Sequence, residues 1–190
     1  MKVHKISDGI WKLTGTDSVN AYLVDIGEKI MIDAGNRADR QDMLRFLGNM
    51  ADLGKISKVI FTHLHYDHIG NFDIFPKAEF FASDMEIKDF ERSTHDSVLD
   101  KDMVEKFNIK LKPLPDRIGP LEIIKTPGHT AGSICIWYPE KKVLFTGDTL
   151  FPNKNIGRTD LPTSAPSKMN DSLINLLRYN LKILAPGHDY

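Results

Sequence analysis

The chain has 190 residues, of which 41% are hydrophobic and 27% charged, a composition typical of a globular domain with a substantial core. Its formal net charge of -1 provides no attraction for nucleic acid or a membrane surface, so we expect neither partner. Cys135 is the single cysteine, no apolar run approaches the ~20 residues of a spanning helix, and the first residues lack the apolar core of a secretion signal. We therefore expect a single cytoplasmic domain over residues 1–190, with two halves at about 1–112 and 113–190.

The first half is predicted to begin as a series of short strands, because apolar runs alternate with the turn residues Gly, Asp, Ser and Asn. Strands are predicted at 10–13, 21–24, 29–32, 58–61 and 78–82. Apolar residues at helical spacing predict a helix over 39–50. Two further helices are expected within 84–108, with a break near 93–95. This last segment is either a lid over a substrate or a pair of helices packed for stability.

The second half repeats the plan of the first. Strands are predicted at 121–125, 133–138, 143–146 and 181–184, and a helix from about 168 to 179. Two β-rich halves, each closed by a helix, predict an α/β fold in which two sheets pack face to face with helices outside.

Potential metal ligands gather directly after these predicted strands. Residues 62–70 read Thr-His-Leu-His-Tyr-Asp-His-Ile-Gly, and three later ligands each follow an apolar strand and a glycine. The candidate ligands are His63, His65, Asp67, His68, His129, Asp148 and His188. Imidazole nitrogen and carboxylate oxygen, without thiolate, suit zinc, iron and manganese. A single histidine beside a strand is usually packed or solvated, but three of the seven histidines here fall within six positions.

The spacing of these ligands predicts two neighbouring metal sites. His63, His65 and His129 match the three-histidine pattern of catalytic zinc, because alternate residues of an extended chain point to the same side. Asp67, His68 and His188 would form the second site. Asp148 could bridge the two, since a carboxylate has two oxygens. Paired metals ~3.5–4 Å apart acidify a bridging water and polarise a substrate oxygen, so the chain is predicted to be a hydrolase with no side-chain nucleophile. In this interpretation Asp67 and Asp148 are catalytic, because they hold and orient the nucleophile as well as the metals.

Short motifs around these ligands resemble those of a known family. They are His-x-His-x-Asp-His at 63–68, Pro-Gly-His-Thr at 127–130, Thr-Gly-Asp-Thr at 146–149 and Pro-Gly-His at 186–188. Together with Met-Ile-Asp-Ala-Gly at 31–35, they resemble the metallo-β-lactamase superfamily. The resemblance implies a four-layer αββα sandwich with the metal site at the sheet edges.

Within that superfamily, the order of the seven ligands and the segment Gly-Arg-Thr-Asp-Leu-Pro at 157–162 resemble the hydroxyacylglutathione hydrolases, or glyoxalase II. This resemblance implies that a hydroxide between two divalent metal ions, expected to be zinc with iron or manganese as alternatives, cleaves a small-molecule thioester or similar ester. The sequence stops two residues after His188, where those enzymes continue into a helical region that helps to hold glutathione. The expected match is therefore to short glyoxalase-like hydrolases, and a role for glutathione stays open.

Three further residues have two interpretations each. Asp33 either orients a metal-bound histidine or is a carboxylate of the turn after a strand. Arg158 and Asp160 either contact substrate at the site entrance or pair with each other to hold their loop.

Cys135 alternates with apolar residues in a predicted strand, so we expect a buried structural thiol.

Rival functions remain from the sequence. The first is an iron-dependent persulfide dioxygenase with one metal, which the resemblance at 157–160 also fits. A lactonase is weaker, because Leu150 and Phe151 stand where those enzymes place a tyrosine. A ribonuclease is weaker still, since no basic arm is present. The number of subunits stays open, a homo-oligomer included.

Overall fold

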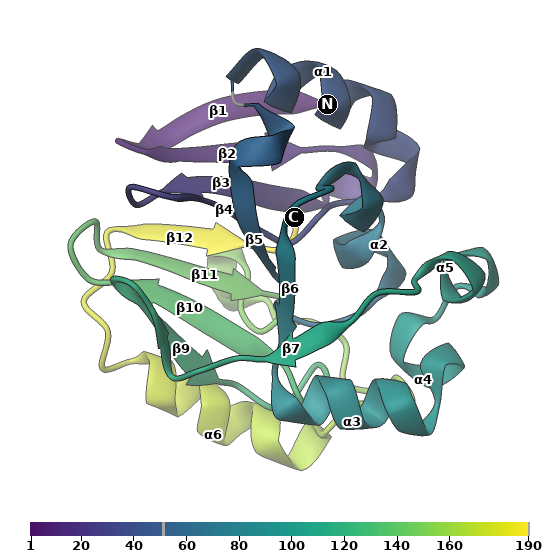
Figure 1. Ribbon diagram of the computed structural model, residues 1–190. Coiled ribbons are helices and arrows are strands. Elements are labelled where there is room, and N and C mark those ends of the chain that lie inside the picture. Colours follow the sequence, from purple (N-terminus) through teal and green to yellow (C-terminus); the bar gives the residue numbers. More distant parts are fainter. Residues whose placement is uncertain (51, 190) are drawn as a thin grey trace.

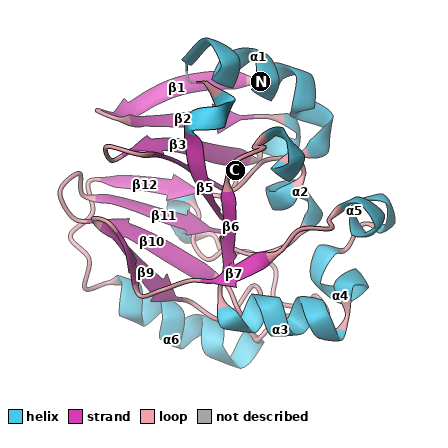
Figure 2. Ribbon diagram, in the orientation of Figure 1, coloured by secondary structure: helices cyan, strands magenta, loops and turns pink. Residues whose placement is uncertain are grey.

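The computed structural model describes residues 1–50 and 52–189, and its elements form four layers (Figures 1 and 2). Two sheets pack face to face, α1 and α3–α5 cover the outer face of the first sheet, and α6 covers the outer face of the second. The predicted αββα sandwich is therefore confirmed. Among the described residues, no helix is long and apolar enough to cross a membrane.

The first sheet contains seven strands in sequence order. They are β1 (Lys2–Ser7), β2 (Ile10–Thr14), β3 (Asn20–Asp25), β4 (Lys29–Ile32), β5 (Ile56–Ile60), β6 (Glu79–Ala82) and β7 (Leu111–Pro113). Neighbours from β1 to β4 run antiparallel, and those from β4 to β7 run parallel. Because parallel strands need crossovers, helices enter the chain in the second part of this sheet.

The second sheet contains five strands in the order β12-β11-β10-β9-β8. They are β8 (Arg117–Ile118), β9 (Leu121–Lys125), β10 (Ile134–Tyr138), β11 (Val143–Gly147) and β12 (Ile183–Pro186). All neighbours are antiparallel except β11 and β12, which run parallel. This parallel pair brings the ends of two distant segments to the same place.

Six α-helices in the described part of the chain complete the fold. They are α1 (Arg40–Met50), α2 (Tyr66–Ile69), α3 (Asp84–Arg92), α4 (Thr94–Val98), α5 (Lys101–Lys106) and α6 (Pro166–Leu176). Short 3-10 turns occur at Thr16–Ser18, Arg37–Asp39, Leu53–Lys55, Phe72–Ile74 and Pro152–Lys154.

The alternation of side chains along the strands builds two cores at once. In β3, Tyr22 and Val24 point into the core between the sheets, whereas Ala21 and Leu23 belong to the core under the helices. Successive side chains of a strand point to opposite faces, so a strand covered on both faces is apolar throughout. The inter-sheet core fixes how the two halves of the chain face one another, and therefore positions the site described below.

The structure corrects the sequence prediction at several elements. The segment 84–108 contains three helices and not two, because Leu99 adopts a left-handed conformation (φ 64°) and Asp100 caps a new helix by accepting a hydrogen bond from Met103 N. Strands β1, β7 and β8 were missed. β1 is an edge strand with exposed side chains, and β7 and β8 are too short to show a pattern. The last helix also begins earlier than predicted, with Pro166 in its first turn.

Candidate metal centre

Five segments deliver the seven predicted ligands to one end of the sandwich. His63 and His65 lie in the loop after β5, and Asp67 and His68 lie in the short helix α2 that follows. His129 lies in the turn between β9 and β10, whereas Asp148 and His188 directly follow the ends of β11 and β12. The sequence therefore places each ligand just beyond a strand, where loops from different strands meet.

Glycines before the ligands leave the space that the site needs. A side chain at Gly187 would place its Cβ 2.2 Å from Asp148 Oδ1 and 2.8 Å from His68 Cε1. Gly147 has a φ of +46°, and a Cβ there would lie 2.6 Å from Thr62 Oγ1. Gly187 N also donates to Gly147 O at 2.7 Å. The recurring pattern of strand, glycine and ligand thus has a steric cause.

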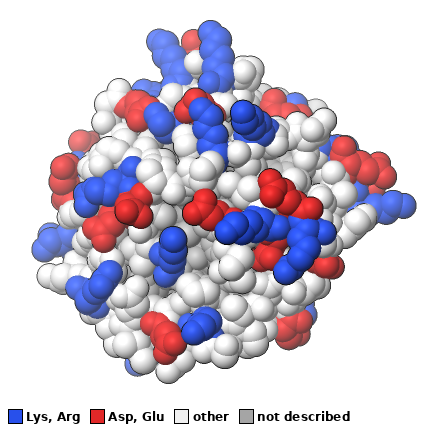
Figure 3. Space-filling model, turned by 60° about the horizontal axis from the view of Figure 1, so that its bottom comes forward, with Lys and Arg blue, Asp and Glu red and all other residues white. Residues whose placement is uncertain are grey.

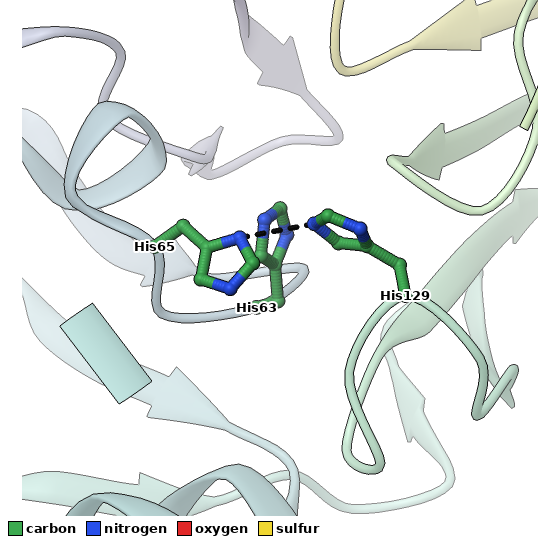
Figure 4. Close-up of side chains that lie close together, drawn as sticks. All are labelled: His63, His65 and His129. Carbon is green, nitrogen blue, oxygen red and sulfur yellow. Dashed lines mark hydrogen bonds between the residues drawn. The ribbon is translucent and has the colours of Figure 1, made fainter. Parts of the chain in front are cut away.

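Three histidines form a first group, which we name the three-histidine group: His63, His65 and His129 (Figure 4). His65 Nδ1 and His129 Nε2 lie 2.9 Å apart. The ring of His63 lies 4.5 Å from that of His65 and 4.7 Å from that of His129, measured between centroids, and is nearly perpendicular to both. One nitrogen from each ring lies within 4.8 Å of the others, and all three residues are buried. Their nitrogens converge on a single position.

A second group, which we name the acidic group, consists of Asp67, His68 and His188. His188 Nε2 lies 3.3 Å from Asp67 Oδ2, and His68 Nε2 lies 4.0 Å from the same oxygen. Asp148 lies between the two groups: its Oδ1 is 3.3 Å from His68 Nε2, and its Oδ2 is 3.6 Å from His129 Nε2. Its carboxylate therefore faces both groups, as a bridging ligand must.

The two groups differ in protonation. Burial, reinforced by neighbouring histidines, holds the pKa of His63 well below its usual value. Burial also lowers the pKa of His65 to about 3 and lowers that of His129. The three-histidine group is therefore neutral at pH 7, which is the form of imidazole that binds a metal.

Carboxylates reverse this effect in the acidic group. Burial opposes protonation of His68, but Asp148, Asp33 and Asp67 together raise its pKa well above the usual value. Burial likewise opposes protonation of His188, yet hydrogen bonds to Asp148 and Asp67 raise its pKa to about 9. The carboxylates therefore favour positive charge at these two rings.

The donor atoms fit divalent metal ions. Within the described part of the chain, His63 Nε2 is buried without a hydrogen-bond partner, and the buried atoms His68 Nε2 and Asp148 Oδ1 face each other at 3.3 Å without a well-formed hydrogen bond. Buried polar atoms are nearly always paired, so ring nitrogens and a carboxylate oxygen left in this state at one place indicate a cation. Nitrogen and oxygen ligands without thiolate suit zinc, iron or manganese.

Outer hydrogen bonds orient several of these rings. Asp33 Oδ2 lies 2.9 Å from His68 Nδ1. Of the two interpretations given for Asp33, the structure shows the contact with a histidine. The carbonyl of Arg158 lies 2.7 Å from His129 Nδ1, and that of Asp17 lies 3.1 Å from His188 Nδ1. A carbonyl only accepts, so each holds the proton on Nδ1 and leaves Nε2 available for a metal. The two carbonyl contacts had no signal in the sequence, because every residue has a carbonyl.

The loop of Arg158 and Asp160 was predicted either to contact substrate at the entrance or to be held by a pair between these two residues. Arg158 Nε and Nη2 donate to the two carboxylate oxygens of Asp160 at 2.9 and 3.1 Å, and both side chains are exposed. These two residues thus pair with each other. A cavity of about 230 Å³ opens beside them at the metal centre. It is lined by His129, Asp148, Phe151, Ile156, Gly157 and Arg158.

Sequence reasoning missed Glu86, a buried carboxylate beside the three-histidine group. It accepts hydrogen bonds from Leu64 N at 3.0 Å and from the Thr130 hydroxyl, so it contacts both loops of the three-histidine group. The pattern Ser83-x-x-Glu86 is that of a helix capping box, which would have assigned this glutamate to the start of α3. Only the Ser83 half of that pattern is present, with Glu86 N donating to Ser83 Oγ at 3.2 Å.

Comparison with known proteins agrees with this geometry. The sequence profile of the metallo-β-lactamase superfamily matches residues 14–188. A probable metallo-hydrolase of Methanocaldococcus jannaschii is 36% identical over 94% of this chain and 92% of its own length. A hydroxyacylglutathione hydrolase of Rhodospirillum rubrum is 36% identical over 71% of this chain but only 49% of its own length. Among solved structures, TTHA1623 in a di-iron-bound form has the same fold, with a TM-score of 0.76 and 24% identity over 94% of this chain and 92% of its own.

Proposed function

The chain belongs to the metallo-β-lactamase superfamily, and from this premise we propose that it is a binuclear metal-dependent hydrolase acting on a thioester or similar ester of a small molecule. The observation that carries the proposal is the convergence of two ligand groups on either side of Asp148. The similarity to a hydroxyacylglutathione hydrolase supports the substrate class, because hydroxyacylglutathione is a thioester. The matched region spans about half of that relative, so glutathione itself is not part of the proposal.

In this reaction the residues of the site would have two roles, binding the metal ions and orienting the attacking water. The three-histidine group would hold one divalent ion and the acidic group the other, with Asp148 shared. Such a pair acidifies water and polarises a carbonyl oxygen at neutral pH. Asp67 and Asp148 have pKa values held below the ordinary range, Asp148 well below, by His68 and His188 against the opposing effect of burial. They are therefore ionised at neutral pH and act as acceptors that orient the attacking water.

The cavity beside Asp148 would receive the substrate. Phe151 and Ile156 provide apolar surface in its wall. Water adds to that carbon, the carbon–sulfur bond breaks, and the products are a carboxylic acid and a thiol. The nucleophile is water, so no side chain needs to form a covalent intermediate.

Nucleic acid is not a proposed substrate. On the face shown in Figure 3, lysine and arginine side chains are interspersed with aspartate and glutamate. A ribonuclease needs a continuous basic surface for the phosphate backbone, and the net charge of -1 offers no excess of positive charge to build one.

The first test measures metal and activity on the same preparation. Protein purified without added metal is analysed by mass spectrometry and assayed against a panel of thioesters and lactones. We expect about two equivalents of zinc, iron or manganese per chain, and hydrolysis that is lost on chelation and restored by the metal. His63→Ala and Asp148→Asn should lose metal and activity together. Full thioesterase activity in an Asp148→Asn protein that has lost its metal would refute the mechanism.

One observation favours a second candidate, a persulfide dioxygenase with a single iron. The three histidines form a ligand group by themselves, and the segment at 157–160 resembles that of such dioxygenases. The neutral three-histidine group would then bind the only ion. About one equivalent of iron, with oxygen uptake when a persulfide is added, would favour this function over hydrolysis.

A further inference from the structure

Glu86 links the two loops that carry the three-histidine group. Its Oε2 accepts from Leu64 N at 3.0 Å, and Leu64 stands between two of the histidines in the chain. Its Oε1 accepts from the hydroxyl of Thr130, the residue after His129. One carboxylate on α3 therefore contacts both loops at positions next to the ligands.

The surroundings of Glu86 are shaped to hold it in this position. The side chain is buried, and among the described residues no lysine, arginine or histidine forms an ion pair with it. A side chain at Gly132 would place its Cβ 2.7 Å from Glu86 Cγ, so the glycine makes room for the glutamate. The Ser83 hydroxyl donates to Gly132 O at 2.6 Å, which ties the start of α3 to the same loop.

This arrangement is unfavourable for Glu86 itself. Burial raises its pKa to about 7, although the hydrogen bonds from Thr130 and Leu64 act in the opposite direction. A buried carboxylate without a cation partner costs free energy, and the side chain of Glu86 does not offset this by capping its own helix. The geometry of the two contacts explains what the carboxylate provides: two acceptor oxygens on one rigid group, each directed to a different loop.

We propose that Glu86 is a positioning residue that fixes the separation between the loop of His63 and His65 and the loop of His129, and so sets the metal affinity of the three-histidine group. The inference rests on the metal centre of the proposed function. Ligands held in place before the ion arrives bind it more tightly, because no ordering of the loops remains to be done. The acidic group has separate supports, since Asp33 holds His68 and the Asp17 carbonyl holds His188. The effect of Glu86 should therefore be selective.

The test measures Zn²⁺ binding at each ligand group separately, in two variants that each lack one of the groups. His188→Ala disables the acidic group and leaves the three-histidine group, whereas His129→Ala does the reverse. Zn²⁺ affinity is measured in each background by competition with a chromophoric chelator. In the His188→Ala background, Glu86→Ala and Thr130→Val should each weaken binding about 10- to 100-fold. Thr130→Ser keeps the hydroxyl and should bind as the unmodified background does. In the His129→Ala background, none of these substitutions should change the Zn²⁺ affinity.

The controls decide between positioning and general stability. Leu47→Ala removes a buried side chain from α1, which carries no ligand, and should lower the thermal midpoint without changing Zn²⁺ affinity. Unchanged affinity in the Glu86→Ala protein, or an equal loss in both backgrounds, would overturn the inference. Should Glu86→Ala fail to fold, the Thr130→Val and Thr130→Ser pair decides alone. If the unmodified chain binds no Zn²⁺ at the three-histidine group, both this inference and the proposed function are refuted.

Discussion

Replacing Asp33 by asparagine should weaken the acidic group more than the three-histidine group. Asp33 Oδ1 accepts from Thr62 N at 2.8 Å, while Oδ2 accepts from the Thr62 hydroxyl at 2.8 Å and lies 2.9 Å from His68 Nδ1. The backbone of Asp33 has a φ of +58°, a left-handed conformation that asparagine tolerates. The loop should therefore keep its shape, with the amide oxygen on Thr62 N and the amide NH₂ facing His68. The Thr62 hydroxyl loses its carboxylate acceptor and lies 3.1 Å from His63 Nδ1, so the exchange reaches the three-histidine group indirectly, through Thr62.

This exchange reverses the hydrogen bond to His68. The asparagine NH₂ donates, so Nδ1 of His68 must accept and the ring proton moves to Nε2. His68 Nε2 is the atom that faces Asp148 Oδ1 at 3.3 Å, and a protonated nitrogen does not bind a cation. In the asparagine protein the competent tautomer lacks the hydrogen bond that the Asp33 carboxylate accepts from His68 Nδ1, and a hydrogen bond to a charged group is worth about 1.5–3 kcal/mol. At 1.4 kcal/mol per tenfold, the affinity of the acidic group should fall roughly 10- to 150-fold.

The assay is a two-step Zn²⁺ titration of the Asp33→Asn protein in competition with a chelator. The step of the acidic group should weaken by the factor above, and the step of the three-histidine group should weaken less, because Asp33 acts on His63 through Thr62 and not by direct contact. Asp100→Asn is the matched control, because Asp100 caps α5 through a hydrogen bond from Met103 N and lies outside the site. Two unchanged steps in Asp33→Asn, or equal weakening of both, would refute the reasoning.

Three further predictions concern stability and reactivity. Gly48→Ala, in α1 where a Cβ meets nothing within 4 Å, should raise the free energy of unfolding by about 0.5–1 kcal/mol in urea denaturation, and a decrease would contradict the helix-propensity argument. Cys135 is buried with its pKa raised by burial to about 11, so a thiol reagent at pH 8 should label it only after denaturation; rapid labelling of the folded chain would contradict this. Glu86 has a folded pKa of about 7 against an ordinary 4.5, so its protonated form stabilises the fold below that ordinary value and the contribution is lost as the pH rises towards 7. The loss in the free energy of unfolding is on the order of 3 kcal/mol. Denaturation series from pH 4.5 to 7.5 should show that the free energy of unfolding depends less on pH in Glu86→Gln than in the unmodified chain. Equal slopes of free energy against pH in the two proteins would contradict the assignment.

The sequence by itself predicted the layers of the fold and the candidate ligands. Strands such as 29–32 and 121–125 were recognised because an apolar run between turn residues is a local signal. The ligand motif at 63–68 was equally local, since metal binding depends on residue types that can be read without a structure. Elements without such a pattern were missed: the polar edge strand β1, the short strands β7 and β8, and the break at Leu99 between α4 and α5.

Only the tertiary structure decided which groups meet across the chain. Asp33 contacts His68 and not another histidine, the Asp17 carbonyl contacts His188 from 171 positions away, and Glu86 joins two loops instead of capping its helix. Arg158 and Asp160 pair with each other on the surface. Such choices depend on how the inter-sheet core sets the two halves against one another, and that packing is a property of many side chains together. Residue type determines what a group can bind, whereas packing determines what lies close enough to be bound.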